Sequence, residues 1–199
     1  MRVAPIVNMA LLLAALATVL PLAGCDSLGL GAATPPPPPS RALDYRQDDL
    51  ASVVFALDLP ADLQPVRNAS TARLDITTPD KGNRHLKATL VLADGDSIDG
   101  ELPPPAAGRT YYLLGFADRD RKAIADAQKW LAGLPPGSAP VVAFGVTPKF
   151  CETAAIDPAA TQISVLPALP SAGPLLPLVN AQPVTAAING GQVPPCGSI

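Results

Sequence analysis

The sequence predicts a mainly β fold over residues 49–199, a small β-sandwich-like domain with one amphipathic helix. Short apolar runs with a period of two alternate with turn-forming residues, which is typical of a sandwich. One longer segment instead repeats its apolar residues with a helical period. Prolines number 25 of 199 residues, about 13% against a usual level of about 5%, so the backbone should be interrupted often. An α+β open sheet is the alternative architecture.

Three early runs alternate clearly, and each should give a strand with one apolar face. These are residues 51–59 with Val53, Phe55, Leu57 and Leu59, residues 72–77 with Leu74 and Ile76, and residues 85–93 with Leu86, Ala88, Leu90 and Leu92. Asp94–Gly95 is typical of a two-residue hairpin turn, so the chain should return as a strand through residues 96–102.

Four later runs are also predicted to be strands. Residues 110–117 and 140–146 are continuous apolar runs, of the kind buried on both faces of a sheet. Residues 161–169 and 174–181 are interrupted by proline, which removes a backbone donor and therefore fits edge strands.

Residues 118–134 are predicted to form the amphipathic helix. Its apolar stripe consists of Ile124, Ala127, Leu131 and Leu134. Asp118 or Asp120 can cap the N-terminus, and Gly133 with Pro135 should end the helix.

Residues 1–24 have the pattern of a secretory signal peptide. Arg2 provides a basic start, an apolar stretch follows, and small residues end it at Ala23–Gly24. An uncleaved membrane helix is the alternative, because no charged residue lies between Arg2 and Asp26 and about 20 apolar residues can span a bilayer.

Leu22-Ala23-Gly24-Cys25 resembles the lipobox of bacterial lipoproteins. The resemblance implies cleavage before Cys25, a diacylglyceryl group on its sulfur, and often a further acyl chain such as palmitate on the new amino group. Two or more acyl chains hold a protein stably on a membrane. The domain is therefore expected in the cell envelope, lipid-anchored to the inner or outer membrane and facing the periplasm. Asp26 resembles an inner-membrane retention signal and favours that membrane.

Residues 25–48 are predicted to be a proline-rich flexible tether behind the lipid anchor. Most of them are small, polar or proline, so they cannot bury enough apolar surface to offset the cost of ordering. Pro35–Pro39 should adopt polyproline II and act as a stiff spacer of about 15 Å. A ligand for the aromatic groove of a partner is the alternative interpretation of these prolines.

Two cysteines, Cys151 and Cys196, remain once Cys25 is assigned to the anchor. A lone pair in an exported domain favours a disulfide, worth about 4 kcal/mol for a loop of this size. A metal site or a catalytic thiol is the alternative. It has little support, because the chain has a single histidine and no C-x-x-C spacing.

Several classes of function are disfavoured. Nucleic acid is not an expected partner, because the net charge is −3, the 14 basic residues are scattered, and aromatic residues make up 4%. No G-x-S-x-G or P-loop motif occurs. The single histidine, His85, starts an alternating strand between charged neighbours and is interpreted as a solvated polar residue.

An acidic segment at residues 94–101 could gather oxygen ligands for calcium. It contains Asp94, Asp96, Asp99 and Glu101. Ile98 occupies the fifth position, where an EF-hand loop needs an oxygen ligand, so a solvated turn is preferred. No metal or other cofactor is predicted.

The preferred hypothesis is a non-enzymatic envelope lipoprotein with a structural or partner-binding role. Its partners would be the membrane, through Cys25, and another envelope protein. A solute- or metal-binding lipoprotein is the second hypothesis, and an envelope enzyme is the third.

Overall fold

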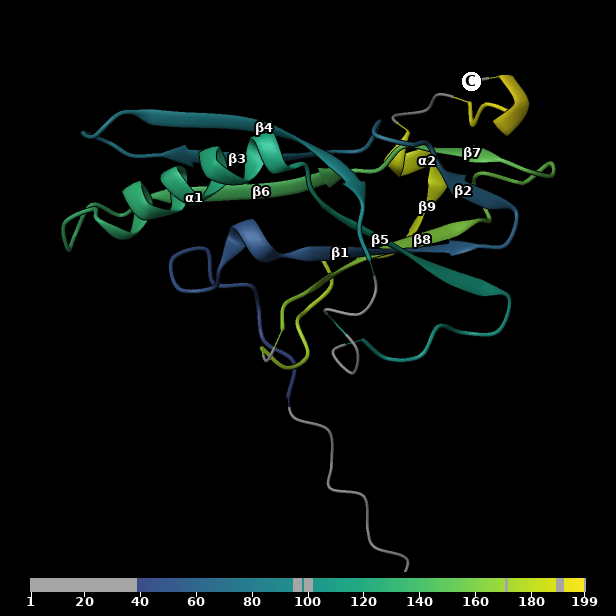
Figure 1. The fold of residues 1–199 in the computed structure, drawn as a ribbon, viewed down its shortest axis with the longest axis horizontal. Helices are drawn as coiled ribbons and strands as arrows, with labels where there is room; N and C mark the ends of the chain where they lie inside the picture. The colour runs from purple at the N-terminus through teal and green to yellow at the C-terminus, as the bar shows by residue number, and fades with distance from the viewer. Residues whose placement is uncertain (1–38, 95–97, 99–101, 171, 189–191, 199) are drawn as a thin grey trace, which may run out of the picture. The chain divides into compact units, whose positions relative to one another are not determined.

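Within the residues that the structure describes, the chain forms nine strands, one long helix and short helical turns (Figure 1). The computed structural model describes residues 39–94, 98, 102–170, 172–188 and 192–198. The strands are β1 Val54–Pro60, β2 Leu63–Pro65, β3 Thr71–Thr77, β4 Asn83–Leu92, β5 Arg109–Phe116, β6 Val141–Thr147, β7 Phe150–Glu152, β8 Gln162–Ala168 and β9 Val179–Pro183. The helices are η1 Leu50–Ser52, α1 Asp118–Ala132, α2 Val184–Ala187 and η3 Cys196–Ser198. The predicted mainly β class with one sizeable amphipathic helix is confirmed.

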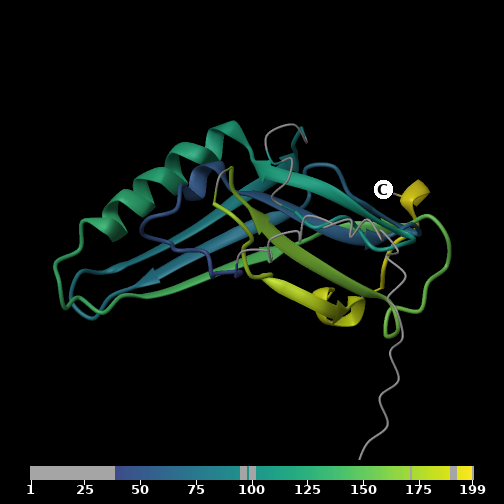
Figure 2. The same ribbon diagram turned by 90° about the horizontal axis from the view of Figure 1, so that it is seen from below.

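Seven strands form one antiparallel sheet in the order β6-β3-β4-β5-β1-β8-β9, and β2 pairs separately with β7. The large sheet curls so far that β6 faces β1, although three strands lie between them in the sheet (Figures 1 and 2). The rings of Phe55 on β1 and Phe144 on β6 stack with centroids 5.7 Å apart. The sandwich-like core therefore comes from a single sheet that folds over itself.

The core contains the apolar face predicted for the first strand, since Val53, Phe55, Leu57 and Leu59 are all buried. The predicted faces of β3 and β4 also point inward, with the exception of Leu92, which is 50% exposed. The rings of Phe55 and of Phe116 on β5 are nearly perpendicular, and their centroids are 5.6 Å apart. Both halves of the curled sheet thus contribute aromatic rings to one core.

Helix α1 lies along one side of the curled sheet (Figure 2) and buries Ile124, Ala127 and Leu131, as the stripe predicts. The capping prediction was wrong: the N-cap is Ala117, with no side-chain cap hydrogen bond. Asp120 instead accepts a hydrogen bond from the backbone N–H of Thr89 at 2.7 Å. Strand β4 pairs with β5 only at its last three residues. Thr89 precedes them, so its backbone N–H is bonded by the Asp120 carboxylate and not by β5.

Two strand predictions need correction at the ends of the sheet. Residues 140–146 were predicted to be buried on both faces, but β6 is an edge strand whose alternate residues are exposed. Residues 161–169 were predicted to form an edge strand, but β8 lies between β1 and β9. Pro167 is tolerated because β9 pairs with β8 only from Gln162 to Val165, so no β9 acceptor lies opposite the proline.

The predicted return strand through residues 96–102 is not the partner of β4. That partner is β5, which begins at Arg109 and pairs Leu90–Leu92 with Leu114–Phe116. Ile98 and Leu102 lie where the chain bends, and Ile98 is buried against Val54 and Ala168. The apolar residues of this segment therefore cover the outer face of the sheet, whereas the prediction placed them in a hairpin.

The compact unit spans Pro37–Ile199. It begins earlier than the predicted domain boundary at residue 49, because residues that follow the prolines pack against the domain, as described below. Among the described residues, no helix is long and apolar enough to span a membrane.

Candidate interaction surface

The lipid-anchor prediction concerns residues outside the described part of the chain. Cys25, the lipobox before it and Pro35–Pro38 all lie there. The same is true of Asp96, Asp99 and Glu101 in the acidic segment, where only Asp94 and Ile98 are described. Within the described ranges, no group of three or more His, Cys, Asp or Glu side chains could hold a metal ion.

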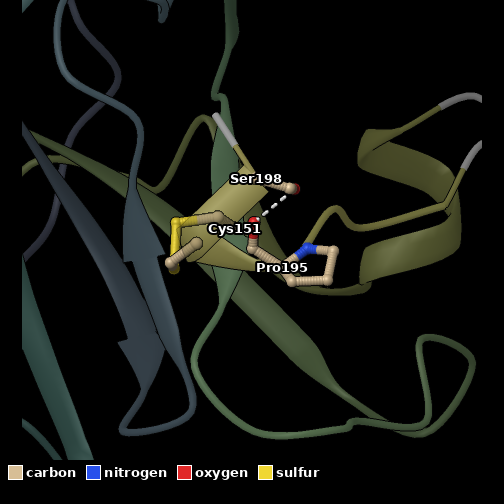
Figure 3. Close-up of a disulfide and its surroundings, with 4 residues drawn as sticks. Cys151, Pro195 and Ser198 are labelled. Carbon is tan, nitrogen blue, oxygen red and sulfur yellow. Dashed lines mark hydrogen bonds between the residues drawn. A yellow bond between two sulfur atoms is a disulfide. The ribbon is translucent and has the colours of Figure 1, made fainter.

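The predicted disulfide is confirmed: Cys151 on β7 is bonded to Cys196 in η3, and their Cα atoms are 4.8 Å apart (Figure 3). A hydrogen bond of 2.9 Å from the N–H of Glu152 to the carbonyl of Pro194 runs beside it. The hydroxyl of Ser198 donates to the carbonyl of Pro195 at 2.7 Å (Figure 3). The C-terminal segment is thereby tied to the two-stranded sheet by one covalent link and local hydrogen bonds.

The segment that follows the prolines, residues 39–50, is fixed to the domain; we call it the junction. Arg41 donates two hydrogen bonds to the Asp48 carboxylate, at 2.6 and 2.7 Å. This guanidinium, helped by the N–H of Asp44 at 2.7 Å, lowers the pKa of Asp48 below its usual value. Arg41 also forms a backbone bridge with Leu175. The ion pair thus closes a loop from Arg41 to Asp48, and the bridge to Leu175 holds the start of that loop.

Helix α1 holds the other end of the junction through one amide side chain. The Gln128 Nε2 group donates to the carbonyls of Tyr45, at 3.3 Å, and Asp48. Its Oε1 atom accepts from the N–H of Leu50 at 3.2 Å. Leu43 is buried in the main core, and the Tyr45 ring lies 6.0 Å from that of Phe144 on β6. The described end of the predicted tether is therefore part of the folded domain.

The outer face of β3 and β4 is charged. His85 is exposed, as predicted, and its Nδ1 lies 2.8 Å from the Asp75 carboxylate in the directly opposite position on β3. Arg73 contacts the same carboxylate at 2.6 Å. The hydrogen bond to His85, followed by that to Arg73, lowers the pKa of Asp75. These three residues form a solvated polar cluster on the two strands, in keeping with the polar role assigned to His85.

Strand β6 continues this face but carries no charge. Its outward residues Val141, Ala143, Gly145 and Thr147 are all exposed. Ala143 lies opposite Asp75, and Gly145 lies opposite Arg73. In the described part of the chain β6 pairs only with β3. Every second residue therefore directs its backbone donor and acceptor away from the sheet, which is the arrangement that accepts an added strand.

Surface clefts among the described residues include one beside the junction and one beside the start of α1. One, of about 460 Å³, lies between residues 42–46 of the junction and the start of β6, and includes Val142 and Leu131. The other, of about 530 Å³, lies among η1, β4, β5 and the start of α1, and includes Asp94, Asp118 and Arg121. The first adjoins β6 and also includes Asp44 and Arg46. The second, which we call the charged cleft, has Asp94, Asp118 and Arg121 in its walls.

Sequence reasoning missed both the junction and the β6 edge. The seven-residue spacing of Arg41 and Asp48 has no recognised motif, and Gln128 lies about 80 residues from its partners. The one available signal for the edge was the absence of charge and proline in β6 together with small residues at positions 143 and 145. That composition was instead interpreted as burial on both faces.

No protein-family model matches the chain, and neither the curated proteins nor the solved structures give a match. The functional argument consequently depends on the residues and geometry of this domain.

Proposed function

We propose that the chain is a membrane-anchored envelope lipoprotein whose periplasm-facing β domain acts by binding another protein and has no catalytic role. The lipobox-like Leu22-Ala23-Gly24-Cys25 supports the anchor, and the prolines at residues 35–39 support a spacer between lipid and domain. The charged outer face and the open β6 edge beside it support protein binding.

The observation that carries the proposal is the junction. A lipid-anchored tether that ended in a loose coil would let the domain swing freely about its attachment point. Here the residues directly after the prolines belong to a segment held by the Arg41–Asp48 ion pair, by Gln128 and by burial of Leu43. The tether therefore meets the domain at a fixed place. A fixed attachment restricts the orientations of the domain above a membrane and suits the presentation of one face to a partner.

Replacing Cys25 tests the anchor. Cys25→Ser removes the sulfur that would carry lipid, so the protein should leave the membrane fraction, whereas the wild type should pellet and show an added lipid mass without residues 1–24. Ser40→Ala is the matched control, because it changes an exposed residue outside the lipobox, leaves Cys25 and the disulfide in place, and should still pellet. Persistent pelleting of Cys25→Ser, or a wild-type mass that retains the leader and has no lipid, would contradict the proposal.

Solute binding is the second candidate, and the charged cleft favours it. Its volume of about 530 Å³ lies within the range of about 300–1,000 Å³ that small-molecule sites occupy. Arg121 in its wall is partly engaged by Asp118, at 3.4 Å, and donates to the carbonyl of Phe116 at 3.1 Å. A ligand that binds there should raise the melting temperature of the wild type, by mass action, and should do so less for Arg121→Ala.

A further inference from the structure

We propose that the partner of the β6 edge is a second copy of this chain, whose own β6 pairs antiparallel with it about a two-fold axis centred on Phe144. The inference rests on the proposed function and deepens it by naming the protein that the domain binds. It joins two seven-stranded sheets into one continuous sheet across the open edge.

The side chains of β6 are self-complementary about Phe144. In antiparallel register, residues whose numbers are equally distant from 144 lie opposite each other. Phe144 then meets Phe144 of the other copy at the axis, and the two small residues Ala143 and Gly145 meet on either side of it. Further out, Val142 meets Val146, and the β-branched Val141 meets the β-branched Thr147. Pairs of β-branched residues are favourable across strands, and the small pair permits close approach. Each half of the strand therefore matches the size of the other half.

Charge complementarity also favours a second copy. Strand β6 has no charge, so its pairing with itself brings no like charges together at the interface. On the outer face, Asp75 lies beside Ala143 and Arg73 lies beside Gly145. Because Ala143 of one copy faces Gly145 of the other, Asp75 of one copy and Arg73 of the second copy flank each central pair on the two β3 strands. On β4, His85 lies beside Asp75 and Lys87 lies beside Arg73, so no two like charges face each other directly across the axis.

A membrane anchor would strengthen this pairing. A single pair of edge strands gives a small interface, which on its own is typical of weak association. Two copies anchored to the same membrane by short tethers experience an effective concentration far above that of the same chains in solution. The dimer is therefore expected on the membrane.

The β3 charges provide a test of register. Ala143→Lys places an ammonium beside Asp75, and Gly145→Asp places a carboxylate beside Arg73, so each variant gains a favourable cross-strand neighbour within its own copy. A Cβ at Gly145 meets no atom within 4 Å. In a dimer of identical variants, two like charges lie diagonally across the axis. In a mixed dimer, the lysine of one copy faces the aspartate of the other.

Full-length chains carrying two different tags, expressed together and extracted from membranes, give the measurement. We expect wild-type copies to co-purify, each variant to lose about tenfold in co-purification with itself, and the Ala143→Lys and Gly145→Asp chains to recover it together. Thr77→Lys, on the exposed face at the end of β3 and therefore not beside the axis, is the matched control and should behave as wild type. Unchanged melting temperatures of all variants would show that folding is intact.

The same cells separate the two proposals. Failure of wild-type copies to co-purify, or self-association of Ala143→Lys at the wild-type level, would overturn the dimer. If the membrane fraction still contains lipidated protein in that case, the proposed anchor survives and only the choice of partner fails. If co-purification follows the charge pattern but the protein carries no lipid, the dimer holds and the anchor fails.

Discussion

The two edges of the seven-stranded sheet are built in opposite ways. Strand β9 has five residues, ends in Pro183, pairs with β8 across an irregularity between Ile163 and Val165, and continues directly into α2. Strand β6 has seven residues without proline or charge, and its four outward residues are exposed. Short length, proline and bulges are the devices by which proteins prevent strand addition at an edge. One edge is thus closed to a further strand and the other is left open.

This contrast carries more weight than the open edge alone. An unprotected edge strand is a hazard because it can recruit other chains in an uncontrolled way. The short length, proline and irregular pairing that protect β9 are all absent from β6. The β6 edge is therefore best understood as a surface that binds a strand of another chain. The following predictions test how differently the two ends of the sheet behave.

Loss of the disulfide should have the largest effect. The Cys151→Ala/Cys196→Ala double variant removes a link across 45 residues, and the chain-entropy model predicts a loss of about 4 kcal/mol in the free energy of unfolding. Urea unfolding measures this loss. Amide exchange by local opening should quicken in β7 and residues 192–198 and stay unchanged at the β6 edge, which lies in the other sheet. Equal quickening in β6 would show that the two regions are not independent.

A matched pair of Val→Ala variants compares the ends of the sheet directly. Val184, which follows β9, is fully buried, whereas Val141 on β6 is 68% exposed. Val184→Ala should lower the free energy of unfolding by about 2 kcal/mol, because it removes buried methyl groups and leaves a cavity. Val141→Ala should change it by less than about 0.5 kcal/mol in the monomer. Similar losses at both positions would contradict the view of β6 as an open edge.

The sequence could predict the elements but not their neighbours. The alternation in β1, β3 and β4 and the stripe on α1 are local patterns, so they indicated which residues enter the core. The disulfide followed from counting cysteines. Strand order is set by contacts between distant residues, and β6 and β8 were consequently assigned the wrong positions in the sheet. An apolar run at an edge resembles one in the interior until its neighbours are known.

The candidate site was less predictable for the same reason. Its parts come from the junction, α1, β3 and β6, and they meet only after the sheet has curled. Gln128 looked like an ordinary polar residue on the helix, yet it satisfies three backbone groups of the junction. A side chain that hydrogen-bonds to backbone groups far away in the sequence leaves no local motif by which it could be predicted.

The Arg41–Asp48 ion pair of the junction, which lies at the β6 end of the sheet, should make the free energy of unfolding depend on pH. The pKa of Asp48 is lowered mainly by Arg41, so the charged carboxylate stabilises the fold above its unfolded pKa of about 3.9. That stability is lost as the pH falls through the lower folded pKa. Asp48→Asn should cost about 1 kcal/mol at pH 7, a modest figure because Arg41 is 42% exposed and solvent screens the pair. Urea unfolding should show the difference from wild type shrinking below about pH 4; a constant difference would contradict this origin.

The smallest expected effect concerns one alanine at each end of the sheet. Ala139, just before β6, and Ala181, within β9, have φ angles of 39° and 46°. A Cβ in this left-handed region costs about 1–2 kcal/mol, and glycine avoids that cost but loses more entropy on folding. Ala139→Gly and Ala181→Gly should therefore each raise the free energy of unfolding by about 0.5 kcal/mol.

The control for these variants is Ala143→Gly on β6. Its φ is not in the left-handed region, so glycine there should lower the free energy of unfolding by about 0.5–1 kcal/mol. Thermal unfolding of all three variants under one condition gives the comparison. If Ala181→Gly raises the free energy of unfolding and Ala139→Gly does not, the side chain of Ala139 makes a stabilising contact that is absent from the single domain. A contact between copies at the start of β6 would account for that difference, and it should then disappear when the same pair is measured in the Ala143→Lys background.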